Sequence, residues 1–518
     1  MRATSTVLRF GDDRYVRAIL VAGLVVQIVS AINAIGYWHP DQQHSIIEFA
    51  TYKLGITPPE LMAREFPEQV RQTLQVYVFL VFYELMGWLH LDDAYTAHTI
   101  LRVLVSLLNF MLFNYIILRT FGDARKITRY TVLLLANFSW AFPYVRTQFS
   151  SESLGGFTYF LAIVLYLELG RRTMSTWRAS LVGLVLSLAF FFRFQMGFAM
   201  IGLGLWLMFL EKTPVRLLAA MTAGFLAGTA FNVFLDSLYY GHFIFTPYKY
   251  WDINITQGRA TGKPNSVWNY VGVLSLLLTF PPLSFVLLFF LGRGLYEKLR
   301  DPYSLSVIFF LAVHAVVPHK EPRFLFPVLG VLPVILGYGF GDYLERLPIP
   351  IRRKNFNLGI QAAFFLTLPL NVVLLVLSLF IPVAQHIAFT KILNDYFDEE
   401  VPVTLVFYQR TPYETPTARS VATYYLHSKK PNIRMETILE RSAFVKRLKH
   451  HGPGTYFVST YDRLVRDRLV GEMDCTRLAV SSEFLLRVNA WVERLNGRVL
   501  PELWALYDCD GNGARSGS

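Results

Sequence analysis

Residues 17–37, RAILVAGLVVQIVSAINAIGY, form an apolar stretch long enough to cross a lipid bilayer as a helix. Similar stretches recur as far as about residue 383 of the 518 residues. The composition agrees, because 53% of the residues are hydrophobic, 17% are charged and the mean hydropathy is +0.38. A soluble globular chain would carry charge on about a quarter of its residues, and the 15% aromatic content excludes disorder. The sequence therefore predicts a mainly α, polytopic membrane protein.

The apolar stretches divide the chain into about eleven predicted spans. After the first they lie at about 102–118, 130–145, 153–169, 179–192, 197–210, 216–236, 269–291, 303–317, 324–341 and 357–382. Lys and Arg gather in the short loops 119–129, 171–178, 211–216, 293–300 and 345–354. Because basic loops stay on the cytoplasmic side, we expect the N-terminus inside and the C-terminus outside. The net charge of +12 is thus a topology signal, and we expect no nucleic acid partner.

Residues 72–90, QTLQVYVFLVFYELMGWLH, are also apolar enough to cross. Counting this segment as one crossing would put every later basic loop outside. We therefore interpret it as re-entrant, interfacial or packed within the protein.

After Pro382 the sequence changes from mostly apolar to mixed polar. We expect residues 1–383 to form the transmembrane module, with 38–72 as its first outer loop, and residues 511–518 to be a flexible tail. Between them, residues 384–510 alternate strand-like and helical patterns, which indicates a small extracytoplasmic α/β domain. The strand-like runs are 401–408 and 455–459, and the helical ones are 417–426, 436–448 and 461–469. Cys475 and Cys509 lie in this outer region, where they form either a disulfide or two unpaired thiols.

Five polar clusters of the apolar part all fall on the predicted outer side. They are His39–His44 (HPDQQH), Arg146–Glu152 (RTQFSSE), Arg193 with Gln195, the loop 239–268, and His319–Arg323 (HKEPR). Ionisable groups at membrane ends are expensive to dehydrate and usually face a cavity or a partner. Together the clusters predict one extracytoplasmic site at the membrane surface.

Each cluster also has a purely structural interpretation. His39-Pro40-Asp41 could end a helix, His319–Arg323 could snorkel at the interface, and Arg193 could be a topological anchor. Glu152 and Arg146 could simply pair with each other, and the aromatic residues of 239–268 could form an interfacial belt.

The residue types suit transfer of a group from a phosphate. Asp41 could act as a general base on an acceptor hydroxyl. Arg146, Lys320 and Arg323 could neutralise a phosphate leaving group. His39, His44 and His319 lack the spacing of a metal site with a third ligand, so we expect no metal and no cofactor. No nucleotide-binding motif appears, which a membrane-anchored donor would explain.

These motifs resemble a known family. They are H-P-D (39–41), R-T-x-x-S-x-E (146–152), D-S-x-x-Y-G (236–241), F-T-P-Y-x-Y-x-x-x-N (245–254) and H-K-E-x-R-F (319–324). The combination is similar to the dolichyl-phosphate-mannose-dependent mannosyltransferases of glycosyltransferase family 22. The chain departs from the usual family pattern at Gln42, at Pro322 and at R-F-Q (193–195), which favours a bacterial or divergent member.

The resemblance implies a GT-C-type helix bundle and an inverting, metal-independent mannosyl transfer. It also implies a polyprenyl-phosphate sugar donor, a glycan or glycolipid acceptor, and contact with membrane lipids. Asp41 would be the catalytic base, with His319, Lys320 and Arg323 near the lipid phosphate and with Tyr248 and Arg146 close by. The further site candidates are His39, Gln42, Arg71, Glu152, Arg193 and Glu321.

Three alternatives remain open at this point. They are a GT-C transferase of another lipid-linked sugar such as aminoarabinose, a lipid-linked-sugar transporter, and a receptor that binds through its outer domain. We expect a bacterial inner membrane or an endoplasmic reticulum membrane, with the site facing the periplasm or the lumen.

Overall fold

The protein is mostly helical. The computed structural model describes residues 13–37, 39–170, 173–259, 266–345, 354–397, 401–414, 416–427, 432–460, 469, 475–496 and 503–509. The chain divides into two compact units. Unit 1 comprises Met1–Ile32, Pro67–Val78 and Leu101–Leu379, and unit 2 comprises Asn33–Phe66, Phe79–Ile100 and Phe380–Ser518.

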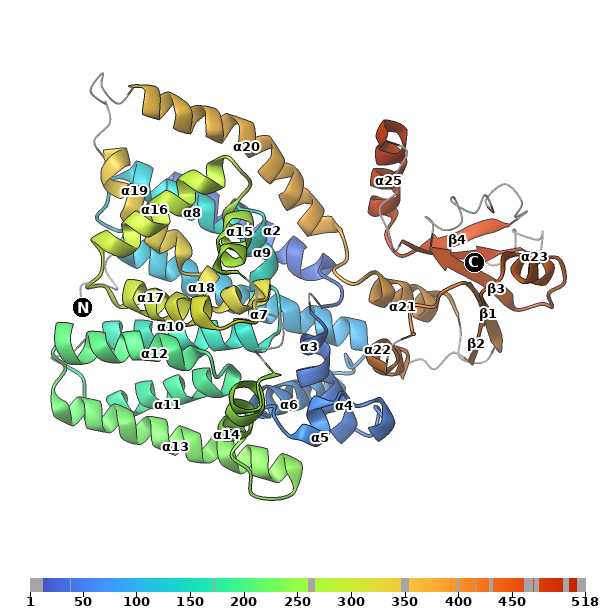
Figure 1. Ribbon diagram of the computed structural model, residues 1–518, viewed down its shortest axis with the longest axis horizontal. Coiled ribbons are helices and arrows are strands. Elements are labelled where there is room, and N and C mark those ends of the chain that lie inside the picture. The colour runs from blue at the N-terminus through green and yellow to red at the C-terminus, as the bar shows by residue number, and fades with distance from the viewer. Residues whose placement is uncertain are drawn as a thin grey trace. The chain divides into compact units, whose positions relative to one another are not determined.

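The predicted spans all fall on helices, most of them in unit 1 (Figure 1). These helices are α2 (Arg14–Asn33), α7 (Ala94–Thr120), α8 (Lys126–Phe138), α9 (Ala141–Arg146), α10 (Ser151–Leu169), α11 (Thr176–Phe192), α12 (Met196–Leu205) with η4 (Trp206–Leu210), α13 (Val215–Tyr240), α15 (Val267–Leu278), α16 (Leu283–Glu297), α17 (Pro302–Val316), η7 (Pro322–Leu325), α18 (Phe326–Leu329), α19 (Leu332–Glu345) and α20 (Lys354–Phe380). The predicted loop 239–268 contains the short helix α14 (Thr246–Trp251) with η5 (Asp252–Thr256).

Not every predicted span is one straight helix. Among the described residues, five helices are long and apolar enough to cross a membrane, or up to seven if each bent pair counts as one span. The predicted span 269–291 is broken, because α15 and α16 meet at a bend of 108°. Pro281 and Pro282 lie at this break, where the lack of a backbone N–H ends a helix. The predicted span 324–341 is bent by 67° between α18 and α19.

The segment 72–90 forms the helix α6 (Leu74–Trp88). With 15 residues it rises about 22 Å, which is less than the roughly 30 Å of a hydrocarbon core. It is one of four shorter apolar helices among the described residues.

Glycines let neighbouring helices of unit 1 approach closely. In Figure 1, α11 lies beside α13, and a Cβ added at Gly183 or Gly224 would come within 1.8 Å of a backbone carbonyl of the other helix. Contacts between small residues replace the hydrophobic effect as the packing force inside a membrane. The two glycines therefore set the spacing of this helix pair.

Unit 2 contains a five-stranded sheet with the order β2-β1-β3-β5-β4 (Figure 1). Its strands are β1 (Val403–Tyr408), β2 (Ile433–Ile438), β3 (Thr455–Thr460), β4 (Thr476–Val480) and β5 (Trp504–Asp508). The helices of this region are α21 (Gln385–Tyr396), α22 (Pro416–His427), α23 (Arg441–Lys449) and α25 (Glu483–Asn496). β1 pairs in parallel with β2 and β3, whereas β5 pairs antiparallel with β3 and β4.

The alternation of side chains along β1 builds two hydrophobic layers. Leu405 and Phe407 pack with Phe389 of α21 on one face, and Val406 and Tyr408 pack on the other face with α23. Successive side chains of a strand point to opposite faces, so one apolar strand can serve both layers. The central strand β1 is therefore covered on both sides.

The strand-like runs 401–408 and 455–459 and the helical run 417–426 are confirmed by β1, β3 and α22. The prediction of a helix over 436–448 is partly wrong, since β2 occupies its first residues and α23 begins at Arg441. Residues 461–468 and the tail 511–518 lie outside the described residues. β2, β4 and β5 were not predicted, because five or six residues of mixed polarity carry little periodicity of their own.

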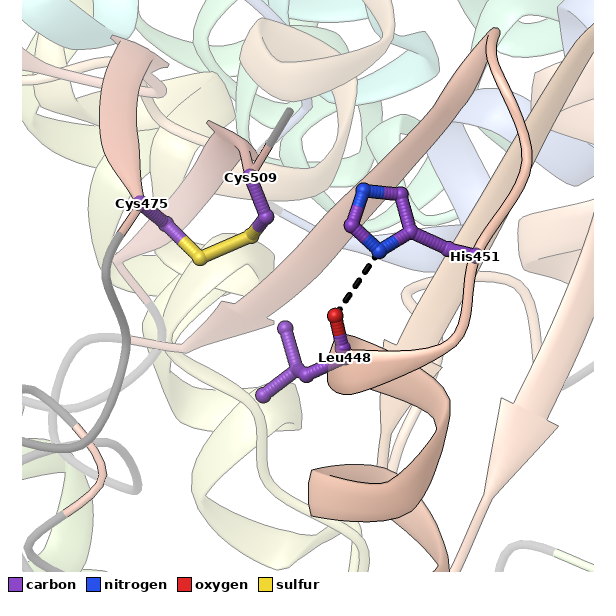
Figure 2. The surroundings of a disulfide bond; sticks show 4 residues. All are labelled: Leu448, His451, Cys475 and Cys509. Atoms are coloured by element: carbon purple, nitrogen blue, oxygen red, sulfur yellow. Dashed lines mark hydrogen bonds between the residues drawn. A yellow bond between two sulfur atoms is a disulfide. The ribbon is translucent and has the colours of Figure 1, made fainter. Parts of the chain in front are cut away.

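Cys475 and Cys509 form a disulfide, which closes a separation of 34 residues (Figure 2). Cys475 lies directly before the edge strand β4, and Cys509 lies directly after its neighbour β5. Beside the bond, the Nδ1–H of His451 donates to the carbonyl of Leu448 at 2.8 Å. The disulfide therefore ties the two antiparallel strands together at one end.

The predicted first outer loop, 38–72, is largely helical, and it belongs to unit 2 as far as Phe66 and to unit 1 from Pro67. It contains α3 (Pro40–Gln42), η2 (Gln43–Glu48), α4 (Phe49–Lys53), η3 (Pro59–Leu61) and α5 (Glu65–Glu68). The backbone N–H of Ala384 donates to the carbonyl of Ile35 at 3.1 Å, and the Tyr37 hydroxyl lies 3.1 Å from Nε2 of His386. The start of this loop is thus fixed to the segment that leads into α21.

Candidate functional site

His39-Pro40-Asp41 begins a helical stretch instead of ending one. His39 is the N-cap of α3, Pro40 is its first residue, and the helical stretch continues through η2 to Lys53. Nδ1 of His39 accepts a hydrogen bond from the backbone N–H of Asp41 at 3.2 Å. Since Nδ1 therefore carries no proton, it cannot donate to Oδ1 of Asp41, which lies 3.4 Å away. The Asp41 side chain is 22% exposed, so it remains accessible in unit 2.

Two neighbours on the same helical stretch are buried. Gln42 is 6% exposed and Glu48 is fully buried. Glu48 accepts hydrogen bonds from Nδ1 of His44 at 2.7 Å and from the backbone N–H of Ala63. A buried carboxylate is stable only when it is paired and hydrogen-bonded. Glu48, which the sequence analysis did not single out, therefore fixes the Asp41 helix against the second half of the loop.

A buried ion cluster lies at the centre of the predicted site residues of unit 1. Oε1 of Glu152 lies 3.3 Å from Nη1 of Arg193 and 3.4 Å from Nη1 of Arg323. The three side chains are at most 6% exposed. Ser151 adds a hydrogen bond to each side, since its hydroxyl donates to Glu152 and accepts from Arg193. Glu152 thus pairs with two arginines, and not with Arg146.

The H-K-E-x-R-F motif extends this cluster. Glu321 accepts from Nε of Arg323 and lies 2.7 Å from Nε2 of His319. Both guanidinium groups lie over the ring of Phe324, at 5.3 Å from its centre for Arg193 and 5.4 Å for Arg323. This geometry is that of two cation–π contacts on one ring. With Arg323 buried, the cluster is not a set of snorkelling surface charges.

Lys320 binds to the end of a helix. Its ammonium group donates to the carbonyl of Ala315 at 3.1 Å and to that of Val317, and it lies 5.4 Å from the ring centre of Tyr270. Only 9% of the residue is exposed. A cation at a helix C-terminus is favoured by the helix dipole. Two of its three N–H donors are used in this way, which leaves one for a ligand.

Three predicted site residues lie apart from the ion cluster. Nη1 of Arg146 donates to Oδ1 of Asn137 at 3.2 Å, inside the bundle. Tyr248 is 64% exposed on α14. Arg71 is buried, and its carbonyl accepts from the Tyr240 hydroxyl at 2.8 Å. None of the contacts described for Arg146 or Tyr248 joins them to Glu152.

Two residues near the cluster were missed. The hydroxyl of Tyr250 accepts from Gln195 at 2.9 Å, so Tyr250 and not Tyr248 reaches the loop that carries Arg193. Asp236 is 1% exposed and accepts from the backbone and the hydroxyl of Thr73, both at 2.7 Å, and from Thr246. The signal for Asp236 was available, because it is a lone acidic residue in the apolar helix α13.

The described residues contain no group of three His, Cys, Asp or Glu side chains that could hold a metal ion. The charged groups of unit 1 are suited instead to an anion, since arginine forks match the geometry of phosphate oxygens.

Sequence comparison relates the chain to known mannosyltransferases. It is 27% identical to Mannosyltransferase APTG1 of Arabidopsis thaliana over 115 residues, which is 22% of this chain and 20% of that protein. It is 30% identical to Alpha-1,2-mannosyltransferase ALG9 of Saccharomyces cerevisiae over 138 residues, which is 26% of this chain and 24% of that protein. The chain thus matches about a fifth to a quarter of the length of these curated relatives.

The fold is similar to that of ArnT from Cupriavidus metallidurans. The structure of ArnT bound to undecaprenyl phosphate matches with a TM-score of 0.52 and 14% identity, and covers 97% of this chain and 99% of that one. The apo structure matches with a TM-score of 0.51, 13% identity, and coverage of 95% and 97%. The expected GT-C-type fold is thereby confirmed.

The family model of the Alg9-like mannosyltransferases matches residues 18–420, which include both the ion cluster and the Asp41 helix. The family expected from the motifs is thereby confirmed. The chain belongs to the Alg9-like mannosyltransferase family.

Proposed function

We propose that the chain transfers mannose from a polyprenyl-phosphate donor to a hydroxyl of a glycan or glycolipid acceptor at the extracytoplasmic membrane face. The observation that carries this proposal is the charge of the buried cluster in unit 1. Three cations, Arg193, Lys320 and Arg323, are accompanied there by two carboxylates, Glu152 and Glu321.

Counted over these five side chains alone, three cations and two carboxylates carry one net positive charge. A phosphodiester such as a polyprenyl-phosphate sugar carries one negative charge, so it would complete the balance. When the bond to the sugar breaks, the phosphate gains a second negative charge. Arginine N–H groups that are already in place would stabilise that charge without reorganising.

Asp41 would act as the general base. Its carboxylate would take the proton of the acceptor hydroxyl, whose oxygen would attack the anomeric carbon of the sugar. The bond from that carbon to the phosphate oxygen would break, and the lipid phosphate would leave with the electron pair. Attack opposite to the leaving group would invert the anomeric centre. The partial exposure of the Asp41 side chain supports this role.

The location is proposed to be the periplasmic face of an inner membrane or the lumenal face of the endoplasmic reticulum. The disulfide of Cys475 and Cys509 supports this, because disulfides persist in oxidising compartments. The predicted outer position of the C-terminal region follows independently from the basic loops.

The comparisons support the donor class. The related proteins are named as mannosyltransferases, and the ArnT structure holds undecaprenyl phosphate. One observation favours a second candidate, a transferase of another lipid-linked sugar. The ArnT match extends over 97% of the chain, whereas the matches to the mannosyltransferases extend over 22% and 26%.

The test uses the full chain in detergent with short-chain polyprenyl-phosphate mannose, a panel of mannoside acceptors, and EDTA. We expect transfer that survives EDTA and disappears in Asp41→Asn. Asp395→Asn, on α21 with a half-exposed side chain that pairs with Lys391, is the matched control and should retain transfer.

Two results would contradict the proposal. Substantial transfer by Asp41→Asn would overturn the base assignment. Absence of both binding and transfer with the mannosyl donor would favour the transferase of another lipid-linked sugar, to be tested next with other polyprenyl-phosphate sugars.

A further inference from the structure

Arg146 is a buried cation that the proposed reaction does not need. It ends α9, and 3% of it is exposed. Nη1 donates to Oδ1 of Asn137, and the guanidinium lies 5.7 Å from the ring centre of Phe113. Within the described part of the chain, neither Nε nor Nη2 has a hydrogen-bond partner.

Arg146 is one of the residues that line a small cavity in unit 1. The polar residues of its wall are Asn109, Arg146 and Ser153, and most of the other residues are apolar, among them Phe113, Phe142 and Phe326. The volume open to the centre of a water molecule is about 20 Å³. This space holds one or two water-sized groups, but not a hexose.

Among the described residues, no contact described for Arg146 is with a carboxylate. Asn137 is a neutral amide that is also bonded to Asn114 in both directions, at 2.8 Å and 3.1 Å. Glu152, which precedes the cavity residue Ser153, is shared by Arg193 and Arg323. A buried charge needs a counter-charge, because its desolvation costs several kcal/mol even after relaxation. A water molecule would satisfy the N–H groups, but it would not supply that charge.

We propose that this cavity binds a halide-sized monovalent anion, chloride, with Nε–H and Nη2–H of Arg146 as its donors. The anion site is separate from the proposed donor site and does not depend on it. It stabilises unit 1, in which Arg146 joins α9 to α8 through Asn137.

The experiment measures the thermal unfolding midpoint of the full-length protein in detergent, without donor, as chloride replaces gluconate at constant ionic strength. Binding to the folded state raises the midpoint as ln(1 + [L]/Kd). We expect a saturable rise of a few degrees with chloride or bromide in the wild type, and none in Arg146→Met. Arg119→Met, which removes a cation that is about a quarter exposed and paired with Glu168, should keep the chloride response.

A second variant keeps the test decisive if Arg146→Met fails to fold. Ser153→Asp places a carboxylate in the first turn of α10, where the helix dipole favours it, at the wall of the same cavity. The unfolding midpoint of this variant should be the same in chloride and in gluconate. It should also be at least as high as the midpoint of the wild type in gluconate.

Three results would overturn the anion site. If the unfolding midpoint of the wild type does not depend on the anion, the cavity binds no chloride. A chloride response that persists in Arg146→Met or in Ser153→Asp would locate the anion elsewhere. In the third result, short-chain polyprenyl phosphate raises the unfolding midpoint of the wild type in gluconate, and chloride has no effect. If only Arg146→Met loses this rise, the guanidinium binds the donor and not chloride.

Discussion

Oε1 of Glu152 lies 3.3 Å from Nη1 of Arg193, so a carboxylate from the first turn of α10 pairs with the residue that directly follows α11. Both side chains are almost fully buried. The same oxygen also reaches Arg323, and it therefore holds together two guanidinium groups that would repel each other without it. The proposed phosphate site depends on this carboxylate, which is a positioning residue.

Removal of the Glu152 charge should destabilise unit 1 strongly. Glu152→Gln removes the carboxylate that Arg193 and Arg323 share, and breaking a buried pair by removing one partner costs about 3–5 kcal/mol. The measurement is the thermal unfolding midpoint in detergent. Glu168→Gln is the matched control, because its pair with Arg119 is about a quarter exposed and should contribute at most about 1 kcal/mol. If Glu152→Gln and Glu168→Gln lower the unfolding midpoint equally, water and not Glu152 offsets the charges of Arg193 and Arg323.

Lysine should not replace Arg323. The substitution Arg323→Lys keeps the charge but loses the planar fork that binds Glu152 and Glu321. Hydrogen bonds to charged groups contribute about 1.5–3 kcal/mol, so we expect donor affinity to fall by roughly 10- to 100-fold. Titration with short-chain polyprenyl phosphate measures this affinity. Arg293→Lys, in an exposed pair with Glu297, should bind the donor like the wild type; unchanged affinity in both would remove Arg323 from the donor site.

Lys320 should have two separable effects. Lys320→Met keeps the length of the side chain but removes the ammonium group that binds the carbonyls of Ala315 and Val317 at the end of α17. The loss of this cap should lower the free energy of unfolding by about 1 kcal/mol, and the loss of the remaining N–H should weaken donor binding. Unfolding and donor titration measure the two effects. A less stable variant with wild-type donor affinity would show that Lys320 acts only as a cap.

Loss of the disulfide should destabilise unit 2 and leave the bundle intact. A closed loop of 34 residues stabilises by about 4 kcal/mol in the chain-entropy model. Cys475→Ser should therefore lower the unfolding midpoint of unit 2, and reduced wild type should behave in the same way. Maleimide labelling without reductant checks the pairing in cells. Labelling of both cysteines in the untreated wild type would contradict the bond and the proposed outer location.

Local patterns were enough to predict the helices of the bundle and two of the five strands, β1 and β3. An apolar stretch in a membrane must satisfy its own backbone hydrogen bonds, so segments such as 153–169 and 216–236 have little choice but to be helical. A continuous run rich in β-branched and aromatic residues was equally informative in β1, where both faces are buried. The local pattern failed for β4 and β5, because strands of five residues depend on their neighbours more than on their own sequence.

The sequence by itself determined the membrane class, the helical segments and the family motifs, including the charged residues of the site. The tertiary structure alone decided how those charges are paired. Arg146 precedes Glu152 by six positions, yet Glu152 pairs with Arg193 and Arg323 from distant segments. Periodicity places residues along one helix, but an ion pair forms where helices from different parts of the chain meet. For that reason the sequence could predict the members of the cluster and could not predict that Arg146 lies beside a cavity of its own.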